Sequence, residues 1–198
     1  MGDALATWFE AKTCVDGNVR NMRGGASSQS ALALARLCYE TLLADGADAR
    51  RAVERKVVTP ALERLVEANT LLSGLGFESS GLAAAHAVHN GLTAAAGTHP
   101  FFHGEKVAFG VLVQLVLEGK PRSLLDDVLA FSTEVGLPIT LAGIGLGQAG
   151  PETLDRIAAR ATAPGETIHN EPFEVRPEMV ADAIRAADAT GQAWMVRR

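Results

Sequence analysis

EKVAFGVLVQLVLEG, residues 105–119, is the stretch that decides the fold, because apolar residues occupy almost every face of the helix it would form. Its longest apolar run, about eleven residues, is too short to span a bilayer. A helix that is apolar all round belongs in the middle of a bundle, surrounded by other helices. We therefore expect this segment at the centre of a helical core.

The segments on either side of it also show helical periodicity. Residues 27–46 carry one apolar stripe at three- and four-residue spacing, with Ser27 and Ser28 as possible caps and Gly46 as a stop. Residues 51–76 predict two helices, the second with Pro60 in its first turn. The stripe in residues 27–46 consists of Leu34, Leu37, Cys38, Thr41 and Leu42.

The second half of the chain shows the same pattern. Residues 123–138 predict an amphipathic helix that ends at Gly136 and Pro138, and further helices begin near Pro151 and Pro177. The glycine-rich stretch GIGLGQAG, residues 143–150, has no preceding strand and lacks the dinucleotide-binding spacing, so we expect a loop. Strand signals are nearly absent. The prediction is an all-α, irregular bundle of about eight to ten helices, forming a single domain over residues 1–198.

Composition narrows the classes of function. The chain is 47% apolar and 21% charged with a formal net charge of −5, and it has no run of basic residues, which argues against a nucleic-acid partner. Its two cysteines, Cys14 and Cys38, lie in helix-like segments and are expected to be buried, reduced thiols. The N-terminal residues do not form a secretory signal, so we expect a cytoplasmic protein that does not associate with membranes.

The histidines suggest a metal site. His86, His89, His99 and His103 place four of the five histidines within eighteen positions. His86 and His89 are three residues apart and face the same side of a helix, and a helix hairpin can bring His103 back towards either. Two imidazoles with a carboxylate as third ligand and an open fourth position would suit a catalytic zinc ion or another divalent cation.

Spacing alone leaves a second interpretation open. The pattern is not H-E-x-x-H, because no glutamate lies between His86 and His89. These two histidines would then pair with backbone carbonyls, and His99 and His103 would be loop residues. His169, in GETIHN, is isolated and is expected to be an ordinary surface or loop histidine.

Four stretches resemble a known family. GDALATWFEA (residues 2–11), GFESSGLAAAHAVHNG (76–91), HGEKVAFG (103–110) and GETIHN (165–170) are similar to glycerol dehydrogenases of the iron-containing (group III) alcohol dehydrogenase superfamily. The resemblance runs over essentially the whole chain, in order and with compatible spacing. Dehydroquinate synthases share the two-domain plan, but their metal set is one glutamate and two histidines, and GDALATW is not their pattern.

The resemblance implies a ligand set. In that family one aspartate and two histidines hold a divalent metal, usually zinc, and these residues correspond to Asp3, His86 and His103, with His89 as the alternative to His86. The phenylalanine of GFESSG, here Phe77, lines the glycerol pocket in the family. The iron-dependent branch has a third histidine four residues after the aspartate, where this chain has Thr7, so zinc is favoured over iron.

The resemblance also implies a missing part. The family has an N-terminal α/β domain that binds NAD and an all-α metal domain, and this sequence resembles only the second. We expect no NAD site in this chain. The expected function is the metal domain of a glycerol dehydrogenase, which oxidises glycerol to dihydroxyacetone with NAD when an NAD-binding domain is supplied, if need be in trans.

Two other interpretations of the sequence remain open. The chain can be a metal- and polyol-binding or self-associating module without dehydrogenase activity, or a helical bundle that binds no metal because Asp3 lies at a frayed terminus. The face that would meet an NAD domain should be unusually apolar or metal-lined, so a homo-oligomer is expected.

Overall fold

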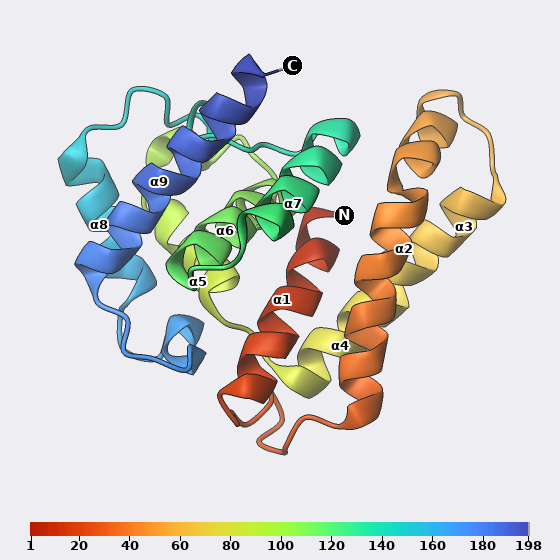
Figure 1. The fold of residues 1–198 in the computed structure, drawn as a ribbon, viewed down its shortest axis with the longest axis horizontal. Coiled ribbons are helices and arrows are strands. Elements are labelled where there is room, and N and C mark those ends of the chain that lie inside the picture. The colour runs from red at the N-terminus through yellow and green to blue at the C-terminus, as the bar shows by residue number, and fades with distance from the viewer. Residues whose placement is uncertain (198) are drawn as a thin grey trace.

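Helix α6 (His103–Leu117) lies at the centre of the computed structural model, which describes residues 1–197. Every residue from 106 to 115 is buried. The helix packs against α1, α5, α7 and α9, so it is covered on all sides (Figure 1). The prediction of a central apolar helix is confirmed.

Helices account for all the regular structure within residues 1–197, where no β-strand occurs. The all-α prediction is therefore confirmed. The α-helices in chain order are α1 (Gly2–Asp16), α2 (Gln29–Glu54), α3 (Pro60–Glu67), α4 (Ser73–Ser80), α5 (Ala84–Leu92), α6 (His103–Leu117), α7 (Arg122–Val135), α8 (Pro151–Ala161) and α9 (Pro177–Val196). Shorter turns of helix are the π turn Ala68–Leu72 and the 3-10 turns Ala96–Thr98, Ala142–Ile144 and Thr167–Asn170.

Helix α1 joins the two sides of the bundle. It packs against α2 and α4 on one side and against α6 and α5 on the other (Figure 1). Helices α8 and α9 pack on each other and on α5 and α6, respectively. The start of α1 is thereby held against the starts of α5 and α6, which is the region that carries the histidines.

The expected stop at Gly46 is wrong, because α2 continues through it to Glu54. Gly46 lies where α2 passes α7, and a Cβ atom there would lie 2.8 Å from Cε2 of Phe131. The glycine therefore permits close packing and does not end the helix. The chain leaves the helical path at Lys56, whose φ of 56° is left-handed. The first of the two helices predicted within residues 51–76 is accordingly the last turn of α2.

Several other sequence signals behave as expected. Pro60, Pro151 and Pro177 each begin a helix. Gly136 ends α7 in a left-handed conformation with φ of 80°, and its N–H donates to the carbonyls of Ser132 and Thr133. The stretch 143–150 forms a loop after a 3-10 turn. Both cysteines are free and buried.

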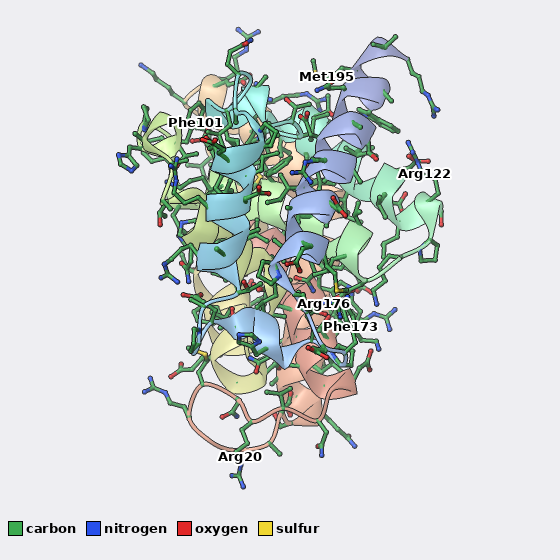
Figure 2. The ribbon with its side chains drawn as sticks, turned by 90° about the vertical axis from the view of Figure 1, so that its left-hand side faces the viewer. Arg20, Phe101, Arg122, Phe173, Arg176 and Met195 are labelled. Atoms are coloured by element: carbon green, nitrogen blue, oxygen red, sulfur yellow. The ribbon has the colours of Figure 1, made fainter. Side chains whose placement is uncertain are left out.

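Charged side chains are spread over the surface of the bundle. Figure 2 shows Arg20 on the loop between α1 and α2 at one end and Met195 on α9 at the other end. Several ion pairs join exposed side chains one helical turn apart, such as Arg36 with Glu40, and each contributes little to stability. None of the helices within residues 1–197 has the length and apolar character needed to cross a membrane.

Helices α5 and α6 approach closely at Gly110, where a Cβ atom would lie 2.4 Å from the carbonyl oxygen of Ala85. We predict that Gly110→Ala lowers the free energy of unfolding by about 1–3 kcal/mol, because the added methyl group forces the two helices apart. The measurement is urea unfolding followed by circular dichroism.

The matched control is Gly74→Ala in α4, where a Cβ atom meets nothing within 4 Å. That change should be neutral or stabilising by up to about 1 kcal/mol, because alanine is the better helix former. Equal effects of the two substitutions would contradict the assigned close packing of α5 on α6.

Candidate metal centre

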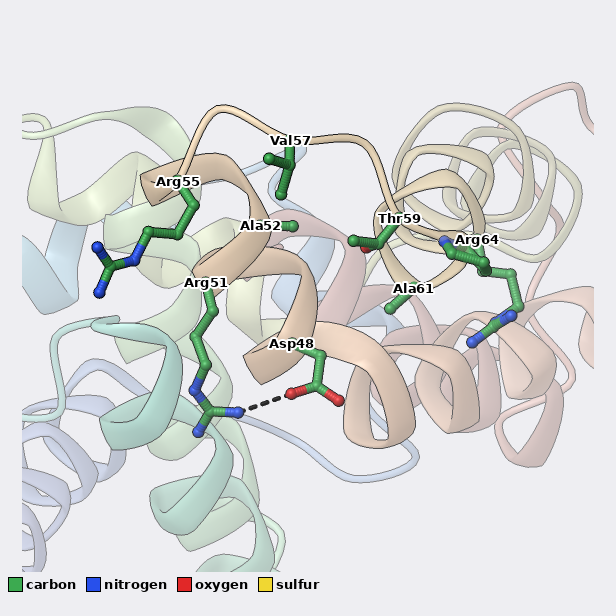
Figure 3. Close-up of a pocket in the computed structure, with 9 residues that line it drawn as sticks. Asp48, Arg51, Ala52, Arg55, Val57, Thr59, Ala61 and Arg64 are labelled. Atoms are coloured by element: carbon green, nitrogen blue, oxygen red, sulfur yellow. Dashed lines mark hydrogen bonds and ion pairs between the residues drawn. The ribbon is translucent and has the colours of Figure 1, made fainter.

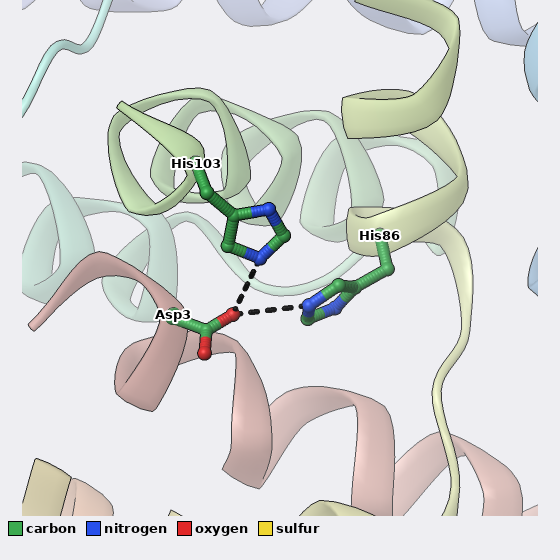
Figure 4. A group of neighbouring side chains, drawn as sticks. All are labelled: Asp3, His86 and His103. Atoms are coloured by element: carbon green, nitrogen blue, oxygen red, sulfur yellow. Dashed lines mark hydrogen bonds and ion pairs between the residues drawn. The ribbon is translucent and has the colours of Figure 1, made fainter. Parts of the chain in front are cut away.

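Three helix N-termini bring the sequence-predicted ligands together. Asp3 lies in the first turn of α1, His86 in the first turn of α5, and His103 is the first residue of α6 (Figure 4). Asp3 Oδ1 is 3.0 Å from Nε2 of His86 and 3.1 Å from Nε2 of His103. One ligand atom from each residue lies within 4.8 Å of the other two. The expected helix hairpin, which brings His103 back towards His86, is confirmed.

Close approach of two glycines places Asp3 beside His103. A Cβ atom on Gly2 would lie 2.0 Å from the carbonyl oxygen of Gly104. The first turns of α1 and α6 are therefore in backbone contact. Asp3 is ordered in the first turn of a helix, where the macrodipole favours a carboxylate.

Asp3 is held as a carboxylate. The hydrogen bond with His86 lowers the pKa of Asp3 to about 2, against the opposing effect of burial, and the charge of His103 adds to the shift. The side chains of Asp3 and His103 are 42% and 51% exposed. The cluster is therefore open to solvent on the side of these two residues and closed on the side of His86.

Glu10 holds His86 from behind. This glutamate is fully buried, and its Oε2 accepts a hydrogen bond from Nδ1 of His86 over 2.5 Å. Burial alone would lower the pKa of His86, but Glu10 and Asp3 outweigh it and raise that pKa to about 10. With Nδ1 committed to Glu10, Nε2 is the nitrogen that faces Asp3. A carboxylate behind an imidazole in this way fixes the ring and raises its basicity.

The same glutamate caps the N-terminus of α5. That helix begins with alanines and has no side-chain cap of its own, so its first N–H groups need partners from elsewhere. Buried side chains from three other segments supply them. Glu10 accepts from Ala83 and His86 at 2.8 and 3.0 Å, Glu171 accepts from Ala84 at 3.2 Å, and Gln114 accepts from Ala85 at 3.0 Å.

His89 stands behind His103 and not beside Asp3. Its Nε2 is 3.0 Å from Nδ1 of His103, and its Nδ1 is 3.1 Å from Oδ1 of Asn90. Burial, together with the charge of His103, lowers the pKa of His89 to about 4, which keeps this ring neutral near pH 7. Both nitrogens of His89 therefore already have partners. This geometry favours His86 over His89 as the partner of Asp3.

The remaining histidines lie apart from the cluster. His99 and His169 are exposed, and each has Nε2 within 3.2 Å of a backbone carbonyl oxygen, that of Thr93 and of Thr162, respectively. The alternative in which His86 and His89 pair with carbonyls does not match the structure, since their partners are carboxylates, an amide and another imidazole.

Thr7 and Phe77 occupy different surroundings. The Thr7 hydroxyl is 2.9 Å from Oγ of Ser73, so it is engaged with α4. Phe77, on α4, lines a surface pocket of about 370 Å³ with Met22, Arg23 and Glu78. None of the three candidate ligands lines that pocket, and the role of Phe77 stays a prediction.

A second surface pocket, of about 520 Å³, lies between the end of α2 and the start of α3 (Figure 3). Its lining includes Arg51, Arg55 and Arg64, and Arg51 donates to Asp48 over 2.7 Å. Its arginines are exposed, and none of the candidate ligands lines it. This pocket is therefore separate from the candidate metal ligands.

The donor set fits a divalent cation. Two imidazole nitrogens and a carboxylate oxygen point at one another, and three lone pairs can converge only if protons or a metal ion lie between them. Against the effect of burial, Glu10 and Asp3 raise the pKa of His86 to about 10, so these carboxylates favour a positive charge at that ring. One carboxylate and two imidazoles with an open side match the ligand types and number of a catalytic zinc site.

Sequence reasoning missed Glu10, although it left a signal. Glu10 is seven residues after Asp3, which places both on one face of α1, and it is an acidic residue in a largely buried helix. A buried acid on the same face as a candidate ligand suggests a supporting partner.

Comparison with solved structures identifies the class of the fold. The crystal structure of glycerol dehydrogenase from Schizosaccharomyces pombe superposes with a TM-score of 0.97 and 43% sequence identity, over 99% of this chain and 51% of that one. The fold of this chain is thus that of about half of a dehydrogenase chain. No family model matches the chain.

The sequence relatives are more specific. Glycerol dehydrogenases from Thermotoga maritima and Citrobacter freundii are 59% and 56% identical over 97% and 100% of this chain. The resemblance to glycerol dehydrogenases is confirmed, and the chain is homologous to them over its whole length. It spans about half the length of the curated relatives that it matches, 53% and 54% for these two.

We predict that Glu10→Gln weakens zinc binding about 10- to 100-fold. The amide nitrogen would face Nδ1 of His86 and favour the tautomer with its proton on Nε2, the nitrogen that faces Asp3. The amide oxygen can still cap α5, so the loss of stability should be smaller than for Glu10→Ala. Competition with a zinc-sensitive dye measures affinity, and urea unfolding measures stability. Equal zinc affinity of Glu10→Gln and the parent would contradict the role of Glu10.

A second prediction concerns the buried acid Glu171. Burial, followed by the neighbouring Glu118, raises the pKa of Glu171 to about 9. Because the folded chain holds this proton more tightly than the unfolded chain, its contribution to stability is complete below about pH 4.5. That contribution is lost as the pH rises towards 9, by up to about 1.4 kcal/mol per pH unit.

Glu171→Gln should remove that dependence. The difference in unfolding free energy between variant and parent should therefore shift in favour of the variant between pH 6 and pH 8.5. Glu174→Gln, at an exposed neighbouring position, is the control and should show no such trend. A pH-independent difference for Glu171→Gln would show that Glu171 is ionised throughout this range.

Proposed function

We propose that this chain is the metal- and substrate-binding domain of a glycerol dehydrogenase, with a divalent ion, preferably zinc, held by Asp3, His86 and His103. The observation that carries the proposal is the convergence of these three side chains from the starts of α1, α5 and α6. The similarity to glycerol dehydrogenases supports the proposal that the reaction is oxidation of glycerol to dihydroxyacetone with NAD. Residues 1–198 act in it as a single domain.

A zinc ion held by these residues would supply a Lewis acid that lowers the pKa of an alcohol. The residues of the chain orient the ligands and leave one side of the site open to substrate. Glu10 fixes the orientation of His86 from the buried side. Asp3 and His103 form the solvent-exposed side, from which a small polyol can enter. Phe77 is proposed to line the glycerol pocket, and α4, which carries it, packs directly on α1.

NAD is proposed to bind outside this domain. The described residues contain no strand from which a dinucleotide-binding unit could be built. We therefore assign NAD to an α/β domain supplied by the same product or by another chain in trans. The cytoplasmic location expected from the sequence stays a prediction.

A second candidate function is a metal- and polyol-binding or self-associating module without dehydrogenase activity. The exposed apolar side chains on α2–α4 and the connections between them favour self-association. They include Leu37, Val53, Val58, Val66 and Leu71, which are 48–77% exposed. Activity separates the two functions, since the second predicts zinc binding without turnover even when an NAD-binding domain is added.

We predict about one zinc ion per chain in the purified protein, lost in both Asp3→Ala and His103→Ala. Each variant removes one of three ligands, which costs most of the affinity. Elemental analysis after dialysis measures the zinc content. His99→Ala is the matched control, because His99 is an exposed histidine of the same segment outside the cluster. Zinc retained in Asp3→Ala, or no zinc in the parent, would overturn the ligand set.

The activity test uses NAD and glycerol, with the chain alone and with the N-terminal half of a glycerol dehydrogenase added. The proposal predicts turnover only in the mixture, with loss of that turnover in His103→Ala. Turnover by the chain alone would contradict the assignment of NAD to another domain. A folded, zinc-loaded mixture that stays inactive would favour the second function.

A further inference from the structure

His103 is held by a chain of hydrogen bonds that ends at a carboxylate on another part of the fold. Glu166, just before the turn Thr167–Asn170, accepts from Nδ2 of Asn90 over 2.8 Å and pairs through its other oxygen with Arg160 of α8. Asn90 contacts His89, and His89 contacts His103. The order of the chain is therefore Glu166, Asn90, His89, His103.

The donor and the acceptor of each hydrogen bond can be assigned by starting from Glu166, the carboxylate at the end of the chain. An ionised carboxylate only accepts hydrogen bonds, so the atom of Asn90 that faces Glu166 must be the NH₂ group. The amide oxygen of Asn90 then faces His89, at 3.1 Å from its Nδ1. An oxygen acceptor at that position requires a proton on Nδ1 of His89. The neutral ring then carries its lone pair on Nε2.

The same reasoning assigns the donor and the acceptor between His89 and the candidate metal ligand His103. The lone pair on Nε2 of His89 lies 3.0 Å from Nδ1 of His103. Two lone pairs would repel at this distance, so Nδ1 of His103 must donate. When the His103 ring is neutral, its lone pair is therefore on Nε2, the atom that lies 3.1 Å from Asp3 Oδ1, and a proton or a metal ion must lie between these two acceptors.

We propose that Glu166, Asn90 and His89 are positioning residues that fix the tautomer and ring orientation of His103, so that Nε2 is its metal-binding atom. This inference rests on the proposed function, in which His103 is a ligand. It gives His89 a role other than that of a substitute ligand. It also gives the two histidine ligands different supports, a carboxylate for His86 and a neutral imidazole for His103.

The chain orients His103 and does not conduct protons to the surface. The amide of Asn90 neither gains nor loses a proton near neutral pH, so a proton cannot pass from His89 to Glu166. The amide of Asn90 instead fixes which atom donates and which accepts in the next hydrogen bond, because its oxygen only accepts and its nitrogen only donates. Supporting partners of this kind commonly change metal affinity 10- to 100-fold when they are mutated.

The test reads the tautomer of His89 directly. Long-range ¹H–¹⁵N correlation spectra of the metal-free parent at pH 7.5 should show His89 protonated on Nδ1 and not on Nε2. In Glu166→Gln the new amide can face Asn90 with either end, so the Nδ1–H preference of His89 should weaken. The zinc affinity of that variant should fall about 10-fold relative to the parent.

The matched control is Arg160→Gln, which breaks the same ion pair but leaves Glu166 as an acceptor for Asn90. It should keep the tautomer of His89 and the zinc affinity of the parent. Protonation of His89 on Nε2 in the parent would overturn the inference. So would unchanged zinc affinity in Glu166→Gln when the tautomer has changed.

Failure of the proposed function would look different. In that case His103→Ala would bind zinc as well as the parent does, or the parent would bind none. The tautomer of His89, measured without metal, then still decides whether the hydrogen-bond chain has the assigned direction. The two ideas can therefore fail separately.

Discussion

The buried carboxylate of Glu10 is the interaction on which the candidate centre depends. One carboxylate on α1 accepts the backbone N–H groups of Ala83 and His86 and the Nδ1 proton of His86. Leaving such buried N–H groups without partners would cost about 1–3 kcal/mol each. The same contacts that start helix α5 therefore also orient the imidazole that faces Asp3. The stability of α5 and the geometry of the candidate metal site are therefore coupled through a single side chain.

Close helix contacts at glycines also position the candidate ligands. The contacts of Gly2 with Gly104 and of Gly110 with Ala85 let three helix starts meet within the reach of one aspartate and two histidines. The positive ends of three helix dipoles point at this region, which favours the carboxylates of Asp3 and Glu10 there. The buried side is fixed by packing and hydrogen bonds, and the solvent side is left open at Asp3 and His103.

Much of the fold could be predicted from local signals, because those signals act within one helix. The apolar run of α6, the prolines that begin α3, α8 and α9, and the left-handed Gly136 all have local physical causes. The expected helix stop at Gly46 was wrong because this glycine is there to permit close contact with Phe131, which is distant in sequence.

The site shows the same limit. The hairpin of His86 and His103 could be inferred from spacing, whereas Asp3 entered only through resemblance to a family. The supporting residues Glu10, Asn90 and Glu166 could not be found by spacing, since their partners lie on other helices and include backbone groups. Anomalous diffraction at the zinc edge, from crystals of the zinc-loaded chain, tests the account most directly. The account predicts one peak bounded by Asp3, His86 and His103, about 2.0–2.1 Å from both Nε2 atoms. A peak bound to His89 or His99, or the absence of a peak at Asp3, would contradict it.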